Sequence, residues 1–198
     1  MQTSIDRRQL LQRLAAVYMG TVILPFSGLA KQSAGQTPMV HIPSGAGKHG
    51  KVGDMDIFFK FSGTQTDNLL GSWETVIQPG ELGAPPHYHS KTDEICRVLE
   101  GTITIMTGET ITEVKAGGWH LRPKNIVHTF WNSGKTPAKT IDLCVPAGHE
   151  LYMQELAALF ENGGRPKKED FTILENKHDI HYRFDLLNDI VKKYGVKL

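Results

Sequence analysis

Residues 85–94 bring together side chains of the kinds that bind metal ions. Residues two apart in an extended strand point to the same side, so His87 and His89 are expected to project together. Four residues then separate His89 from Glu94, which is enough for a turn after which an antiparallel strand directs the carboxylate back toward the two rings. Imidazole and carboxylate together suit a divalent first-row transition metal. The spacing therefore predicts a metal site around these three residues.

A second stretch, residues 117–132, predicts the lining of an interior. His128, Phe130 and Asn132 follow a turn at residues 123–125 and share one face of the strand expected there, because side chains alternate along a strand. An imidazole and an amide on one face, with an aromatic ring between them, indicate the inside of a barrel. Trp131 has the opposite parity and is expected to pack outside.

These two stretches resemble the paired sequence motifs of the cupin family. The HxH, Glu and Gly positions of the first motif are matched, at the family spacing, by His87, His89, Glu94 and Gly101. The second motif is matched by Gly117, Pro123, His128 and Asn132. Asn125 stands where that motif has glycine, and asparagine also tolerates left-handed backbone angles. The resemblance covers about residues 70–147 and implies an all-β fold, a small jelly-roll barrel with a metal inside.

The resemblance also implies the composition of the site. One divalent transition metal is expected to be held by His87, His89, Glu94 and His128. Such a ligand set does not select among Fe, Mn, Ni, Cu and Zn, and it leaves open coordination positions, as a catalytic site requires. Glu94 is expected to be catalytic, as a ligand, as a base for a substrate hydroxyl, or as both in turn. The pocket is expected to be lined by Ile105, Phe130 and Asn132.

Within the cupins, the sequence looks most like the quercetinase-like single-domain group. The likeness rests on the segment PPHYH, the following DE pair, and PAGHELYMQELA after the barrel. It implies a metal-dependent dioxygenase that acts on a small hydroxylated substrate, phenolic or enediol-like. Two alternatives stay open, because cupins host many functions. One is a metal-dependent isomerase or lyase acting on a sugar or keto acid, and the other is a non-catalytic exported module that binds a metal or a small ligand.

Short apolar runs separated by Gly, Pro, Asn and Ser predict the strands that would position these residues. The predicted strands span residues 55–61, 73–78, 94–99, 102–106, 110–114, 119–122, 127–132 and 140–145. Many short strands at close spacing, without helical periodicity, indicate a sandwich or a barrel. Cys96 shares the parity of Glu94 and is expected to be buried, and the sequence leaves open whether it pairs with Cys144.

After residue 145 the hydrophobic period becomes helical. Residues 150–160 place Tyr152, Leu156 and Phe160 on one face, which predicts an amphipathic helix against the barrel. A second helical stripe, stopped by Gly195, consists of Phe184, Leu187, Val191 and Tyr194. Residues 161–181 are expected to form a polar loop. The expected divisions are an export signal (1–36), a linker or arm (37–53), the barrel (54–147) and a helical extension (148–198).

Residues 1–36 have the charged, apolar and small-residue order of an export signal. Arg7 and Arg8, ahead of a leucine pair, resemble the twin-arginine type. A bacterial, periplasmic protein that is exported in its folded state is therefore expected, with no stable membrane anchoring once the signal is cleaved. An uncleaved membrane anchor is the alternative.

Composition narrows the choice of partners. The net charge of +1 comes with no clustered basic face, so no nucleic-acid partner is expected. A small-molecule substrate is expected, and the cupin resemblance implies a homodimer formed through sheet edges or an arm. No ligand role is assigned to the other six histidines, which are His41, His49, His120, His149, His178 and His181.

Overall fold

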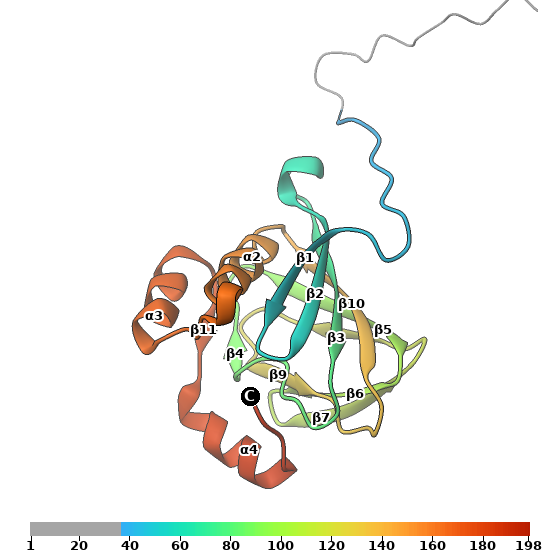
Figure 1. Ribbon diagram of the computed structural model, residues 1–198. Coiled ribbons are helices and arrows are strands. Elements are labelled where there is room, and N and C mark those ends of the chain that lie inside the picture. The colour runs from blue at the N-terminus through green and yellow to red at the C-terminus, as the bar shows by residue number, and fades with distance from the viewer. Residues whose placement is uncertain (1–36) are drawn as a thin grey trace, which may run out of the picture. The chain divides into compact units, whose positions relative to one another are not determined.

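Residues 37–198 are the part of the chain that this computed structural model describes, so the export signal expected at residues 1–36 lies outside the described residues. The strands form two antiparallel sheets arranged as a barrel (Figure 1). The six-stranded sheet has the order β1 (Lys48–Val52), β2 (Met55–Phe61), β3 (Gly71–Ile77), β10 (Ala138–Val145), β5 (Asp93–Glu100) and β8 (Trp119–Arg122). The five-stranded sheet has the order β11 (His181–Tyr182), β4 (His87–Tyr88), β9 (His128–Trp131), β6 (Thr102–Thr107) and β7 (Thr110–Lys115). This predominantly β architecture matches the expected jelly-roll barrel.

Every strand expected from the sequence is present, with ends displaced by two residues or fewer. Strand β2 shows why the expectation succeeded, because Met55, Ile57 and Phe59 are buried while the residues between them are partly exposed. A strand that is buried on one face must alternate in this way, and the alternation is visible in the sequence. Cys96 and Cys144 are both buried and are free thiols, so no disulfide joins them.

Three short strands were not expected. Residues 48–52, which the sequence placed in a linker or arm, form β1 and pair antiparallel with β2. Strands β4 and β11 contain two residues each and pair with one another. A two-residue strand shows no alternation, and the β1 sequence KHGKV has no apolar face. Only the partner strands therefore reveal these elements.

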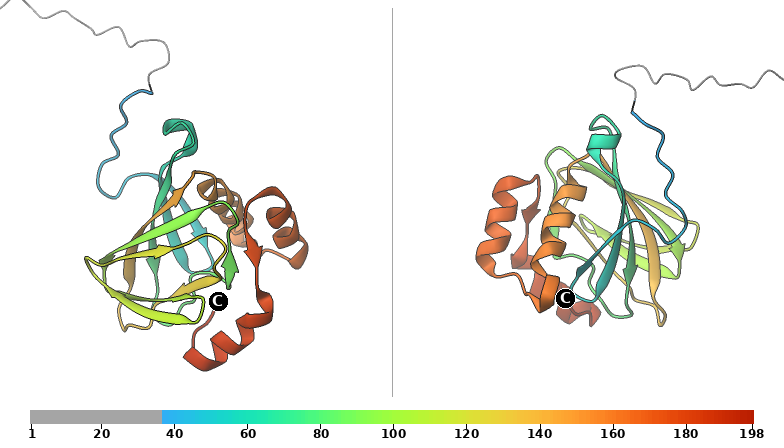
Figure 2. Two further views of the ribbon diagram at one scale, coloured as in Figure 1. Left: turned by 180° about the vertical axis from the view of Figure 1, so that it is seen from behind. Right: turned by 45° about the horizontal axis from the view of Figure 1, so that its top comes forward.

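The helices that follow the barrel lie on one side of it (Figure 2). Helix α2 (His149–Leu159) buries Tyr152, Met153 and Leu156, which confirms the expected apolar face. Helix α4 (Leu187–Tyr194) ends at Gly195, whose φ of 64° is left-handed, as expected for a helix stop. Between residues 37 and 198, no helix combines the length and the apolar character needed to cross a membrane.

The C-terminal region departs from the expectation in two places. Residues 161–181, expected to be a polar loop, contain helix α3 (Lys168–Lys177). Leu174 is the one buried residue of α3. The hydrophobic period of this helix is therefore too sparse to be recognised in the sequence. Phe184, assigned to the second helical stripe, lies instead in the 3-10 helix η3 (Phe184–Leu186) and stacks on Tyr182. Ile190 is the buried residue of α4.

Two hydrophobic clusters hold these elements together. The main cluster joins the two sheets and α2, and it includes Ile57, Trp73, Val98, Ile105 and Leu156. The second cluster joins α4 to the barrel and consists of Leu82, Trp131, Ile190 and Val196. Trp131 therefore packs on the outside of the barrel, as its parity predicts.

Candidate metal centre

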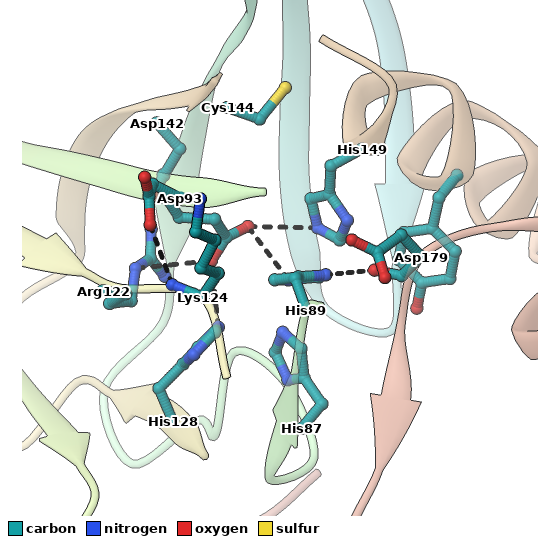
Figure 3. A network of polar contacts seen from close by, with 12 residues as sticks. His87, His89, Asp93, Arg122, Lys124, His128, Asp142, Cys144, His149 and Asp179 are labelled. Carbon is teal, nitrogen blue, oxygen red and sulfur yellow. Dashed lines mark hydrogen bonds and ion pairs between the residues drawn. The ribbon is translucent and has the colours of Figure 1, made fainter. Parts of the chain in front are cut away.

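Both sheets contribute to one cluster of histidine and glutamate side chains. His87 on β4 lies opposite His128 on β9, so the five-stranded sheet brings these two rings together. His89 follows β4, and Glu94 enters from β5 in the other sheet. The ligand atoms of all four residues lie within 4.8 Å of one another, and all four side chains are buried. The cluster could therefore hold one metal ion, and Figure 3 shows its three rings directed toward a common centre.

Backbone carbonyl groups set the orientation of the three rings. Nδ1 of His87 and Nδ1 of His128 each donate to the carbonyl oxygen two residues earlier, over 2.7 and 3.0 Å. Nδ1 of His89 donates to the carbonyl oxygen of Asp179. Because a carbonyl oxygen can only accept, each neutral ring keeps its proton on Nδ1 and presents a lone pair at Nε2.

The Nε2 atoms and one carboxylate oxygen are available to an ion. Within the described chain, Nε2 of His89, Nε2 of His128 and Oε2 of Glu94 are buried without a hydrogen-bond partner. Nε2 of His128 lies 3.1 Å from Oε2 of Glu94. With the ring proton on Nδ1, both atoms of this contact carry lone pairs, and a cation is what would satisfy them. The donor set of imidazoles and a carboxylate fits a divalent transition metal.

Burial and neighbouring charges keep the cluster in the protonation state that metal binding requires. Burial lowers the pKa of His87 well below its usual value, and the neighbouring His128 and His89 lower it further. Burial alone would raise the pKa of Glu94, but Arg122, followed by the surrounding histidines, holds it well below its usual range. At neutral pH the rings of His87 and His89 are therefore neutral and the carboxylate of Glu94 is ionised.

Two residues to which the sequence analysis assigned no role contact Glu94. Arg122 on β8 lies directly opposite Glu94 in the β5–β8 pairing, with its Nε 3.4 Å from Oε2. Nη2 of Arg122 lies 2.5 Å from Oδ1 of Asp142. His149, the first residue of α2, places its Nε2 3.2 Å from Oε1 of Glu94. His149, to which the sequence analysis assigned no ligand role, is not one of the four candidate ligands but contacts the carboxylate of Glu94. The docking of α2 on the barrel produces this contact. The apolar face of α2 predicts the docking, but it does not indicate that His149 meets Glu94.

A cavity of about 770 Å³ opens beside this cluster. Its wall includes His87, Glu94, Arg122 and His149. Most of the remaining wall is apolar or aromatic and includes Trp73, Phe130, Tyr152, Met153, Phe171 and Tyr182. Because α2, α3 and β11 supply several of these side chains, the helical extension forms one side of the cavity.

The three residues that were expected to line the pocket lie in three different environments. Phe130 lines the cavity, as expected. Ile105 is fully buried in the main hydrophobic cluster and is not among the described residues of the cavity wall. The Asn132 side chain donates to the carbonyl oxygens of Ile77 and Thr136, over 2.9 Å in each case, so it fixes the chain after β9. Alternation identifies the inward face of a strand but not the depth to which a cavity extends along it.

Residues 73–145 match the family model of the cupin domain. This match confirms the cupin resemblance for that segment of the chain. A germin-like protein, 9-2, from Oryza sativa subsp. japonica is 31% identical over 75 residues, which cover 35% of this chain and 35% of that protein. The chain thus spans about a third of the length of the curated relative it matches.

Three solved structures have a backbone that is similar over more than half of this chain. An RmlC-like cupin from Shewanella frigidimarina has a TM-score of 0.48 and 18% identity, covering 59% of this chain and 99% of that one. A predicted oxalate decarboxylase from Thermotoga maritima has a TM-score of 0.49 and 20% identity, covering 55% of this chain and 99% of that one. KdgF from Halomonas sp. has a TM-score of 0.47 and 17% identity, covering 52% of this chain and 92% of that one. Similarities of this size carry no inference about activity.

Proposed function

We propose that this protein is a metal-dependent cupin dioxygenase that acts on a small hydroxylated substrate, phenolic or enediol-like. The observation that carries the proposal is that two members of the histidine and glutamate cluster, His87 and Glu94, lie in the wall of a cavity. A structural metal site is usually closed by protein ligands, whereas a site that faces a cavity can admit a substrate oxygen. The dioxygenase reaction and the substrate class rest on the sequence resemblance and on the shape and chemistry of this cavity.

The cavity favours a ring-shaped and partly apolar substrate. Its volume of about 770 Å³ lies within the range of small-molecule sites, and its wall is rich in aromatic side chains. A short-chain acid would fill only a small part of this space. Trp73, Phe130 and Tyr152 supply apolar surface in the same cavity as the candidate ligands, which suits a phenolic ring.

The residues of the chain have separate tasks in such a reaction. When bound, a first-row transition metal would supply a coordination position for the substrate oxygen and the redox chemistry that O₂ requires. The carboxylate of Glu94, kept ionised by Arg122, accepts the proton of the substrate hydroxyl at Oε1, the oxygen that lies beside His149. The aromatic wall orients the ring and keeps water from the reacting atoms.

Metal reconstitution combined with oxygen consumption tests the proposal. Metal-free protein is loaded in turn with Fe²⁺, Mn²⁺, Ni²⁺, Cu²⁺ and Zn²⁺ and supplied with a panel of phenols and enediols while dissolved O₂ is recorded. We expect O₂ consumption with at least one ion. His87→Ala and His128→Ala should abolish metal binding and O₂ consumption. His120→Ala, which changes a histidine outside the cluster, should leave both unchanged.

Three other outcomes would contradict the proposed dioxygenase activity or the metal site. Turnover without O₂ would support a metal-dependent isomerase or lyase. Tight binding of metal and ligand, with no turnover by any loaded form, would support a non-catalytic binding module. Unchanged metal content in both His87→Ala and His128→Ala would contradict the metal site itself.

The location of this activity is proposed from the sequence alone. The twin-arginine-type signal expected at residues 1–36 would carry the folded protein to a bacterial periplasm, so a metal could be loaded before export. Fractionation of the host cell and sequencing of the mature N-terminus check this proposal.

A further inference from the structure

The three histidines of the candidate metal centre are not held in the same way. His87 and His128 donate Nδ1 to carbonyl oxygens two residues earlier in their own strands or turns. His89 donates Nδ1 to the carbonyl oxygen of Asp179, which lies 90 residues later in the chain. The segment between α3 and β11 thus sets the orientation of one ligand. This segment lies outside the cupin match at residues 73–145.

The side chain of Asp179 fastens the same segment to the loop that carries His89. Oδ1 of Asp179 accepts hydrogen bonds from the backbone N of Ser90 over 2.9 Å and from its Oγ over 2.6 Å. Oδ2 accepts a hydrogen bond from the backbone N of Lys91 over 2.6 Å. The carboxylate therefore bonds to the two residues that directly follow His89, and Figure 3 shows Asp179 beside the His89 ring.

Neighbouring residues hold this attachment in place. Ile180, the next residue, is 1% exposed and belongs to the main hydrophobic cluster. The chain then continues into β11, which pairs with β4 next to the ligands. The backbone that directly follows Asp179 is thus held against the barrel.

We propose that Asp179 is a positioning residue of the metal centre, and that the C-terminal extension completes this centre. The carboxylate docks the extension on the loop after His89, and the backbone carbonyl then fixes the tautomer and the ring orientation of His89. The inference rests on the proposed metal binding. Partners of this kind around metal-bound histidines raise metal affinity by holding the ring in its binding geometry.

Matched substitutions in the full chain test the inference. Asp179→Ala removes all three acceptor contacts, whereas Asp179→Asn keeps one acceptor oxygen. Asp185→Ala is the control, because Asp185 lies in the same extension, is largely exposed and hydrogen-bonds only to Arg183 among the described side chains. Affinity is measured by competition between the protein and a chromophoric chelator for Zn²⁺ and Co²⁺. The visible d–d spectrum of the Co²⁺ form reports the geometry of the ligands.

We expect Asp179→Ala to weaken metal binding by about 10- to 100-fold and to shift the Co²⁺ spectrum. Asp179→Asn should show a smaller loss, and Asp185→Ala should match the unchanged protein. A purely structural role would lower the unfolding temperature of the metal-free protein but leave the Co²⁺ spectrum of the folded variant unchanged. That result would overturn the inference.

Two further results separate the possible failures. If Asp179→Ala does not fold, Asp179→Asn and Ser90→Ala carry the test, because Ser90→Ala removes only the hydroxyl contact of 2.6 Å. Unchanged affinity and spectra in both would overturn the inference while leaving the metal site intact. Failure of the unchanged protein to bind any of the tested metals would contradict the proposed function, and this inference with it.

Discussion

Glu94 is the residue on which the charge balance of the site depends. Its Oε1 lies beside His149, and its Oε2 lies beside His128 and Arg122. Arg122 is shared with Asp142, so one buried cation faces two buried carboxyl groups. Burial raises the pKa of Asp142, although Arg122 opposes this effect. An excess of negative charge in a buried group favours the binding of a cation.

Glu94→Gln removes the negative charge and keeps the shape of the side chain. We expect metal affinity to fall by at least about tenfold, since even the outer partners of metal ligands have effects of this size. Competition titration with a chelator measures the change. Glu100→Gln, at the exposed end of the same strand, is the matched control and should have no effect. Equal affinities in the two variants would argue against Glu94 as a ligand.

Helix α4 is attached to the barrel through a cluster that is separate from the main core. Ile190 is 6% exposed and packs with Leu82 and Trp131. The ring centroids of Tyr194 and Trp131 lie 4.5 Å apart. The backbone N of Leu82 also donates to the carbonyl oxygen of Lys197 over 2.7 Å. The end of the chain is thus held by apolar contacts and by backbone hydrogen bonds.

Ile190→Ala tests this attachment. Removing a buried isoleucine side chain should lower the free energy of unfolding by about 2–5 kcal/mol, because apolar burial is lost and a cavity is left. Urea denaturation followed by tryptophan fluorescence measures the change. Lys192→Ala, an exposed position on the same helix, should change the free energy of unfolding by less than about 0.5 kcal/mol. An Ile190→Ala effect as small as this control would contradict the packing of α4.

The molecule as a whole keeps several histidine rings neutral in the metal-free state. Burial lowers the pKa of His87 and His89, and it lowers the pKa of His149 to about 3. In the unfolded chain the same rings take up protons near a pKa of about 6.5. Below that pH the unfolded chain therefore binds more protons than the folded protein. The free energy of unfolding must then decrease as the pH falls.

We predict that the metal-free protein loses stability between about pH 7 and about pH 5. A ring whose folded pKa is about 3 contributes a loss of about 2 kcal/mol at pH 5. Thermal unfolding in the presence of a chelator measures this loss. Zn²⁺-loaded protein should unfold at a higher temperature, because the ion binds the folded state, and the gain should shrink as protons compete for the ligands. An unfolding temperature that does not change with pH in this range would contradict the buried neutral rings.

The sequence by itself determined the features whose signals are local. Alternation placed the strands and the outward position of Trp131, because the direction of a side chain in a strand follows from the backbone within a few residues. His87, His89 and Glu94 lie close together in the chain, and the second motif added His128. The homodimer and the export signal stay predictions of the sequence.

Only the tertiary structure decided which distant groups surround the ligands. Sheet register places Arg122 opposite Glu94, and the docking of α2 and of the segment before β11 brings His149 and Asp179 to the site. Ile105 has the expected inward face but lies in the closed core. No short-range period encodes a contact between segments that are far apart in the chain. Such contacts follow from strand register and helix packing, which are set by the burial of apolar side chains throughout the fold.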